Sequence, residues 1–154
     1  MKVNYMPEGY HNVVADLIVR DGLKAIEFYK KALNATVIGR PFIMSNGKLG
    51  HAGLQVGDSL VMLADEFPDM GTYSPKSVGG TAVIITVYVE DVDWQMKEAL
   101  AAGARVVKPV TNQFWGDRTG QIEDPFGHMW VMATHIENVS EDEMHRRAET
   151  LLAA

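Results

Sequence analysis

The stretch that decides the predicted fold is Gly120–Thr134, with the sequence GQIEDPFGHMWVMAT. Apolar, strand-forming residues flank a tight turn at Asp124–Gly127. Aspartate favours the first position of a type I turn, proline fixes the φ angle of the second, and glycine suits the fourth. We therefore expect a β-hairpin whose closing strand begins directly after the turn.

The closing strand of this hairpin has a second copy, 70 residues earlier in the chain. At that offset Leu60–Met62 matches Trp130–Met132, and Ile18–Asp21 matches Tyr88–Asp91. Similarity at one fixed spacing is typical of a repeated supersecondary unit. The sequence therefore predicts two copies of one small module, with function located between them.

Each copy reads as a strand, a helix and three further strands. Asp21 and Asp91 can cap the two helices, because a carboxylate accepts hydrogen bonds from the free N–H groups of a first helical turn. The fold class is α+β, with two tandem βαβββ modules that form a curled mixed sheet around a pocket, followed by a C-terminal helix. Within a single domain of 1–154, the expected boundaries are module one at about 13–65, a linker at 66–80, module two at about 82–135 and the last helix at about 141–152.

Composition excludes several classes of function. The 154 residues contain no cysteine, so disulfides and thiolate metal sites are ruled out. The formal net charge is −6, whereas nucleic-acid binders usually present a basic face to the phosphates, so we expect no nucleic-acid partner. No apolar run is long enough for a signal peptide or a membrane span. We expect a cytoplasmic protein without a membrane partner.

Alternation along the strands separates a helix-covered face from a pocket face. In the two closing strands, we expect Leu60, Met62, Trp130 and Met132 to lie under helices. The opposite face, which would include Val61, Met129 and Val131, is still largely apolar. A sheet curled around a pocket would cover these side chains.

The duplicated βαβββ unit with DPFG before its last strand resembles the vicinal oxygen chelate superfamily. That group includes glyoxalase I, bleomycin-resistance proteins and extradiol dioxygenases. The strings that carry the resemblance are LIVRDGLKAIEFYKKAL, VYVEDVDWQMKEAL, FWGDRTGQIEDPFGHMW and ATHIENVSEDEMHRR, and they span about Val13 to Arg147. They are most similar to the bacterial glyoxalase/bleomycin-resistance-like branch. The resemblance implies the fold, whereas function varies widely among proteins that share one fold.

The resemblance also implies where a metal would bind. Metal-dependent members place a histidine seven residues before the aspartate that caps each helix, and a glutamate four residues after the glycine of each closing turn. These positions hold Val14, Ile84, Val61 and Val131. Aliphatic side chains cannot ligate a divalent ion, and a catalytic metal site needs about three protein donors. We therefore expect no metal and no cofactor at this site, but a cavity lined by hydrocarbon.

Five further residues are candidate ligand contacts. Asp16 and Tyr88 fall on the predicted pocket face, where Asp16 could anchor a cationic or hydroxyl group; alternatively it is hydrogen-bonded to a strand or exposed at a rim. Phe114, Trp115 and Arg118 lie in the loop NQFWGDR and could stack on a planar ligand and bind its anionic group. Alternatively Trp115 plugs the end of the barrel and Arg118 pairs with Asp117, Glu123 or Asp124.

The acid and base candidates are weaker. His51, Asp65, Glu66 and His135 are the remaining groups that could act in catalysis, with histidine suited to general-base chemistry near neutral pH. Surface or end-of-strand capping roles are favoured for them, because no set of nucleophile, base and orienting group is visible in the sequence.

Two hypotheses follow. The first is a metal-independent binding protein that takes a partly aromatic or apolar molecule into the cavity, with sequestration for resistance as one version. The second is a lyase, isomerase or dioxygenase-type enzyme that uses a metal relocated to His51, Asp65, Glu66 or His135, or acid–base chemistry without a metal. In either case we expect a homodimer, because members of the superfamily commonly pair two chains to complete the half-open pockets that their modules form.

Overall fold

The computed structural model describes residues 3–153. Met1, Lys2 and Ala154, which belong to the predicted domain of 1–154, lie outside the described residues. The first repeat contains β1 (Ala15–Val19), α1 (Gly22–Ala32), β2 (Thr36–Ile43), β3 (Leu49–Val56) and β4 (Ser59–Asp65).

The second repeat has the same order of elements. It contains β5 (Ile84–Tyr88), α3 (Val92–Ala101), β6 (Arg105–Asn112), β7 (Asp117–Glu123) and β8 (Met129–His135), and α4 (Glu141–Leu152) follows. We call the first repeat module one and the second module two. The predicted α+β class, the repeated βαβββ order and the C-terminal helix are confirmed.

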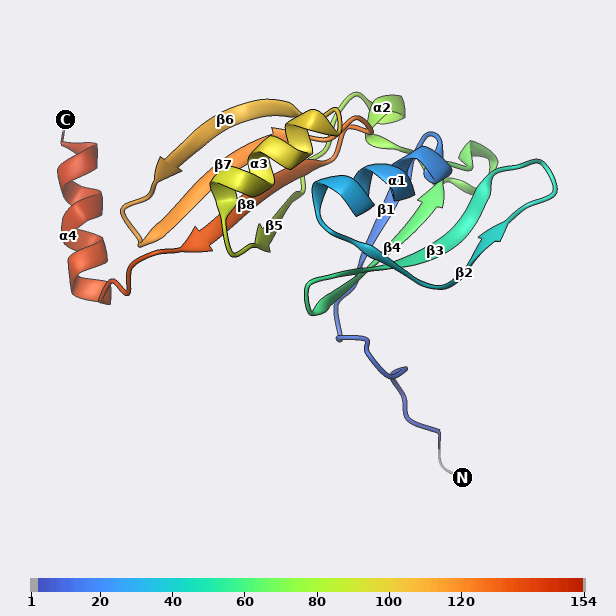
Figure 1. Cartoon of the computed structure of the whole chain (residues 1–154), viewed down its shortest axis with the longest axis horizontal. Coiled ribbons are helices and arrows are strands. Elements are labelled where there is room, and N and C mark those ends of the chain that lie inside the picture. The colour runs from blue at the N-terminus through green and yellow to red at the C-terminus, as the bar shows by residue number, and fades with distance from the viewer. Residues whose placement is uncertain (1–2, 154) are drawn as a thin grey trace.

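The strands form two four-stranded mixed sheets, ordered β1-β4-β3-β2 and β5-β8-β7-β6. In each sheet the first and last strands of the module pair in parallel, and the other neighbours are antiparallel. The two sheets lie side by side along the long axis of the molecule, and neither is a closed barrel (Figure 1). Each sheet has a helix face, which packs against α1 or α3, and an open face, which points away from them.

The helices start where the sequence predicts. Asp21 Oδ1 accepts a hydrogen bond from Lys24 N at 3.3 Å, and Asp91 Oδ1 accepts one from Trp94 N at 3.0 Å. Both carboxylates thus satisfy N–H groups that a first helical turn leaves free.

One hydrophobic core joins the modules through their helices, and α1 contacts α3 directly. The β7–β8 turn reaches across to α1, where Asp124 Oδ2 accepts hydrogen bonds from the Tyr29 hydroxyl at 2.6 Å and from Trp130 Nε1 at 3.0 Å. Gln95 Nε2 of α3 donates to the carbonyl of Ala32 in α1. Burial and the neighbouring Asp124 carboxylate raise the pKa of Tyr29 well above its ordinary value, so its phenol stays a donor.

The linker contains two short helices that the sequence analysis treats as loop, η1 (Pro68–Met70) and α2 (Pro75–Val78). Glu66 binds this segment to module one, because it accepts hydrogen bonds from Ser74 and Ser77 and an ion pair from Arg20. These groups, first of all the two serine hydroxyls, lower the pKa of Glu66 to about 2.

The last helix stands apart from both sheets, at the end of module two opposite to module one (Figure 1). None of its described residues is buried. Arg147 connects it to module two by an ion pair with Glu137 at 2.7 Å and a hydrogen bond to the carbonyl of Phe114. No helix within residues 3–153 has the length and apolar character that crossing a bilayer requires.

Candidate ligand-binding faces

The open face of module two carries a cavity of about 460 Å³. Trp115, Gln121 and Val131 are among the residues that line it. Gln121 pairs with Val131 across the sheet and points to the open face, whereas the next residue, Ile122, is part of the core. A cavity of this size falls in the range that small organic ligands occupy.

Asp117 orients the aromatic side chains of this face. Its Oδ2 accepts hydrogen bonds from the Tyr88 hydroxyl at 2.9 Å and from Trp115 Nε1 at 3.0 Å, and its Oδ1 lies 2.8 Å from His135 Nδ1. Burial acts to raise the pKa of Asp117, but hydrogen bonds from His135, Tyr88 and Trp115 outweigh it and leave the pKa lowered. The carboxylate is therefore ionised near neutral pH and holds both rings in place.

His135 has both ring nitrogens next to acceptors. Nδ1 faces Asp117, and Nε2 lies 2.9 Å from Asn138 Oδ1. The hydrogen bond to Asp117, followed by that to Asn138, raises the pKa of His135 above its ordinary value. This arrangement favours the imidazolium and gives His135 a supporting role toward Asp117.

The open face of module one is mainly apolar. Ile18 and Met62 lie there on neighbouring strands, and Ile38 and Phe42 extend the surface along β2. Phe42 and Ile38 are exposed. Asp16 is the acidic residue of β1 and is also exposed on this face, opposite Met62.

The face predicted for Val61 is wrong. Val61 pairs with Ala15, is only 7% exposed and belongs to the core beside α1. Leu63 is likewise buried in the core, whereas Met62 points to the open face. The side chains of β4 therefore have the opposite phase from the one that the 70-residue offset predicts.

Different turn lengths cause this shift. Val56 pairs with Ser59 around a two-residue turn, whereas Asp124 N donates to the carbonyl of His128 around a three-residue turn. Matching the glycines of the two turns, Gly57 and Gly127, therefore misplaces the strands that follow by one residue. As a result Val61 corresponds to Trp130 at an offset of 69 residues, and the counterpart of Val131 is Met62.

The hydrogen bonds at the helix starts support the same alignment. Asp65 Oδ1 accepts a bond from the N–H of Gly22, and Thr134 Oγ1 accepts one from the N–H of Val92, the first residue of each helix. Asp65 also accepts a bond from the N–H of Leu49. The counterpart of Asp65 is thus Thr134, whereas the sequence analysis implied His135, and both Asp65 oxygens cap backbone groups.

Arg118 does not reach the cavity. Because β7 begins at Asp117, alternation places Arg118 on the helix face, where it forms two hydrogen bonds with Asp93 of α3, at 2.7 and 2.8 Å, and one with Asn112. Arg118 therefore pairs with a carboxylate, as in the alternative interpretation, but its partner is Asp93 of α3, and contact with a ligand anion stays a prediction.

The aromatic pair of the predicted loop remains close to the cavity. Phe114 and Trp115 meet edge to face, with ring centroids 5.0 Å apart, and Trp115 is 36% exposed. Its indole N–H is fixed by Asp117, which leaves the ring available for stacking on a planar molecule.

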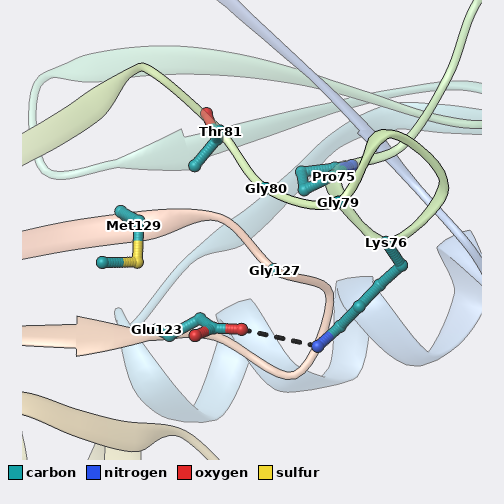
Figure 2. A pocket seen from close by; sticks show the side chains of 8 residues that line it. All are labelled: Pro75, Lys76, Gly79, Gly80, Thr81, Glu123, Gly127 and Met129. Carbon is teal, nitrogen blue, oxygen red and sulfur yellow. Dashed lines mark hydrogen bonds and ion pairs between the residues drawn. The ribbon is translucent and has the colours of Figure 1, made fainter.

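A second cavity of about 460 Å³ lies between the linker and the β7–β8 turn (Figure 2). Lys76 Nζ approaches Glu123 Oε1 at 3.4 Å across it, and Met129 forms part of its wall. Arg105 also pairs with Glu123, and Arg105, more than Lys76, lowers the pKa of that carboxyl group. These contacts connect the linker, β6 and β7.

The sequence matches a known family. The model of the Glyoxalase/Bleomycin resistance protein/Dioxygenase superfamily matches residues 10–132. The chain belongs to this superfamily. An uncharacterized protein of Mycobacterium bovis is 44% identical over 131 residues, which cover 83% of this chain and 86% of that protein.

Solved structures of the superfamily type have the same fold. TioX from Micromonospora sp. ML1 is 28% identical, with a TM-score of 0.64 over 82% of this chain and 99% of TioX. Fosfomycin Resistance Protein FosX from Mesorhizobium loti is 15% identical, with a TM-score of 0.59 over 90% of this chain and 98% of FosX. The likeness to FosX is one of fold.

The metal positions of the superfamily do not fit a metal in this chain. With the alignment corrected they hold Val14, Met62, Ile84 and Val131. Three of these side chains are aliphatic, and the thioether of Met62 is a soft ligand that does not suit zinc, iron, manganese or nickel in oxygen and nitrogen sites. Elsewhere in residues 3–153, three or more histidine, aspartate or glutamate side chains do not gather in a geometry that could hold an ion.

The predicted acid and base candidates lie apart. His51 is exposed on the open face of module one, Glu66 holds the linker, and His135 supports Asp117. Sequence reasoning missed the parts of Asp117 and Gln121 in the cavity. Alternation along β7 could have placed Gln121 on the same face as Val131, but it could not have shown the hydrogen-bond partners of Asp117, which come from β5, β8 and the loop before β7.

Proposed function

We propose that this member of the superfamily is a metal-independent binding protein for a partly aromatic or apolar small molecule. The observation that carries the proposal is the presence of Val14, Met62, Ile84 and Val131 at the four positions where metal-dependent members of the superfamily have their ligands. Hydrocarbon at these positions favours apolar ligand surface, while Trp115 offers a face for stacking. Sequestration of a harmful compound is the version of this function that needs no reacting group.

The proposal includes a homodimer. Ile84 is 54% exposed and Tyr88 is 64% exposed, and Phe42 of module one is exposed as well. Apolar patches of this kind usually mark a surface that a partner covers. Pairing the open face of module one with that of module two from a second copy would enclose the ligand between them.

Binding of 8-anilinonaphthalene-1-sulfonate, followed by calorimetry, tests the proposal. We expect saturable binding with one site per chain, and its loss in Val131→Glu, which places a charge on the open face. Val78→Glu is the matched control, because Val78 is exposed on α2, outside both sheets, and does not line the 460 Å³ cavity beside Gln121. Equal binding by Val131→Glu and the wild type would contradict the proposal.

Metal analysis separates the binding protein from the enzyme. Protein purified without chelators should contain zinc, nickel, iron and manganese far below one equivalent. A stoichiometric metal would favour a lyase, isomerase or dioxygenase instead. Light scattering at micromolar concentration should give the mass of a dimer, and a monomer mass would count against a ligand site shared between two copies.

A further inference from the structure

The side-chain amide of Gln121 differs from the other polar groups on the open face of β7, because it has no hydrogen-bond partner among residues 3–153. Four polar side chains alternate along that face, Asp117, Thr119, Gln121 and Glu123. Asp117 binds three partners, Thr119 accepts a hydrogen bond from Gln113 Nε2 at 2.9 Å, and Glu123 is ion-paired. The amide of Gln121 makes no hydrogen bond with any of residues 3–153.

This amide is also deeply placed. Gln121 is 6% exposed, between Val131 of β8 and Lys108 of β6, and it lines the 460 Å³ cavity. The amide atoms themselves reach the cavity, because within residues 3–153 every fully buried side-chain nitrogen or oxygen has a hydrogen-bond partner. The amide is therefore able to take a hydrogen-bond partner from the cavity.

We propose that Gln121 is the polar anchor of this cavity and selects planar, largely apolar molecules with a hydrogen-bond donor and acceptor side by side, as in a lactam. The inference rests on the proposed function and names its ligand class. A primary amide presents a carbonyl oxygen and N–H donors in one plane, so a lactam edge satisfies both at once. The indole of Trp115 and the side chain of Val131 supply the apolar walls for the rest of the molecule.

Module one supports this assignment by contrast. Gly53 pairs with Met62 as Gln121 pairs with Val131, so the corresponding place in module one has no side chain. At this position, therefore, only module two carries a polar side chain that could bind a ligand.

The test compares 2-quinolone, which has a lactam edge, with quinoline, which has a similar ring and lacks that edge. Calorimetry should show that the wild type prefers 2-quinolone by about tenfold, the effect of one good polar contact. In Gln121→Leu the preference should fall to about one, with quinoline bound at least as well as by the wild type. Gln55→Leu is the matched control and should keep the preference, because Gln55 donates to the carbonyl of Gly57.

The outcomes separate the two proposals. Equal preference in Gln121→Leu and the wild type would overturn the role of Gln121 and leave the binding function standing. If the wild type bound 8-anilinonaphthalene-1-sulfonate but neither probe, the lactam preference would fail and the binding function would stand. A purely structural role would make Gln121→Leu less stable than the wild type in urea, whereas removal of an amide without a partner in the chain should leave its stability unchanged or raised. If a second copy supplied the partner, Gln121→Leu would weaken the dimer without changing the preference, which would also overturn the inference.

Discussion

Module one covers its open face with Ile18, Met62 and Phe42, whereas module two places Tyr88, Asp117 and Gln121 on its own. The helix faces, in contrast, hold the same kind of buried aliphatic and aromatic residues in both modules. The duplicated unit has therefore kept the side chains that fold it and changed those that face outward. The difference teaches that the buried faces of the two modules are alike, whereas their open faces differ most where Gln121 of β7 stands opposite Val131 and module one has Gly53.

The strongest test of this comparison is the phase of β4. Val61→Asp should destabilise the protein by about 3 kcal/mol or more, because it places a carboxylate under α1 without a partner. Met62→Asp, on the open face, should leave the free energy of unfolding of the monomer within about 1 kcal/mol of the wild type. Urea unfolding at low protein concentration measures both. The reverse order would restore the 70-residue alignment and the original assignment of the faces.

A substitution in the β7–β8 turn, which joins the modules, should have the next largest effect on stability. Asp124→Ala should cost about 3 kcal/mol, because it leaves the Tyr29 hydroxyl and the Trp130 N–H buried without their acceptor. The shorter turn of module one offers the control: Asp58 is exposed there, and Asp58→Ala should change stability by less than about 0.5 kcal/mol. Similar losses in the two variants would show that the turn of module two contributes nothing special.

The smallest effect is a pH dependence at the edge of module two. The pKa of His135 is raised in the folded protein, so its stabilising contribution is complete below the ordinary value of 6.5 and is lost as pH rises through the folded value. The lowered pKa of Asp117 works in the other direction, since its contribution is present above the ordinary value of 3.8 and is lost on acidification through the folded value. The pair is therefore most effective between these limits.

Thermal unfolding of His135→Gln at pH 5.5 and pH 8 measures this contribution. We expect the wild type to lose more stability than the variant on going from pH 5.5 to pH 8. The shift should be small, because the imidazole is half-exposed. An identical pH dependence in the two proteins would show that His135 does not support Asp117.

The sequence is sufficient for features that depend on local patterns. The caps Asp21 and Asp91 and the DPFG turn each lie within a few residues of the element they define, so the repeat and its helices could be predicted. The phase of Val61 could not, because it depends on a turn that is one residue shorter in module one.

Arg118 shows the same limit. The sequence predicts that Arg118 lies in the loop NQFWGDR. In the structure β7 already begins at Asp117, within that stretch, and alternation along the strand turns the guanidinium toward α3. The anchoring parts of Asp117 and Gln121 depend on partners or on missing partners across three strands, which no short stretch of sequence reveals.

The positions of the three tryptophans follow from this architecture and supply two independent optical signals. Trp130 is 2% exposed, and its indole N–H is fixed to the Asp124 carboxylate where the modules meet, so its emission reports whether that junction is intact. Trp115 and Trp94 are partly exposed, and Trp115 alone lines the cavity beside Gln121. In a Trp94→Phe background, quenching at the red edge of the spectrum would therefore record occupancy of the cavity, while the blue component would record separation of the halves.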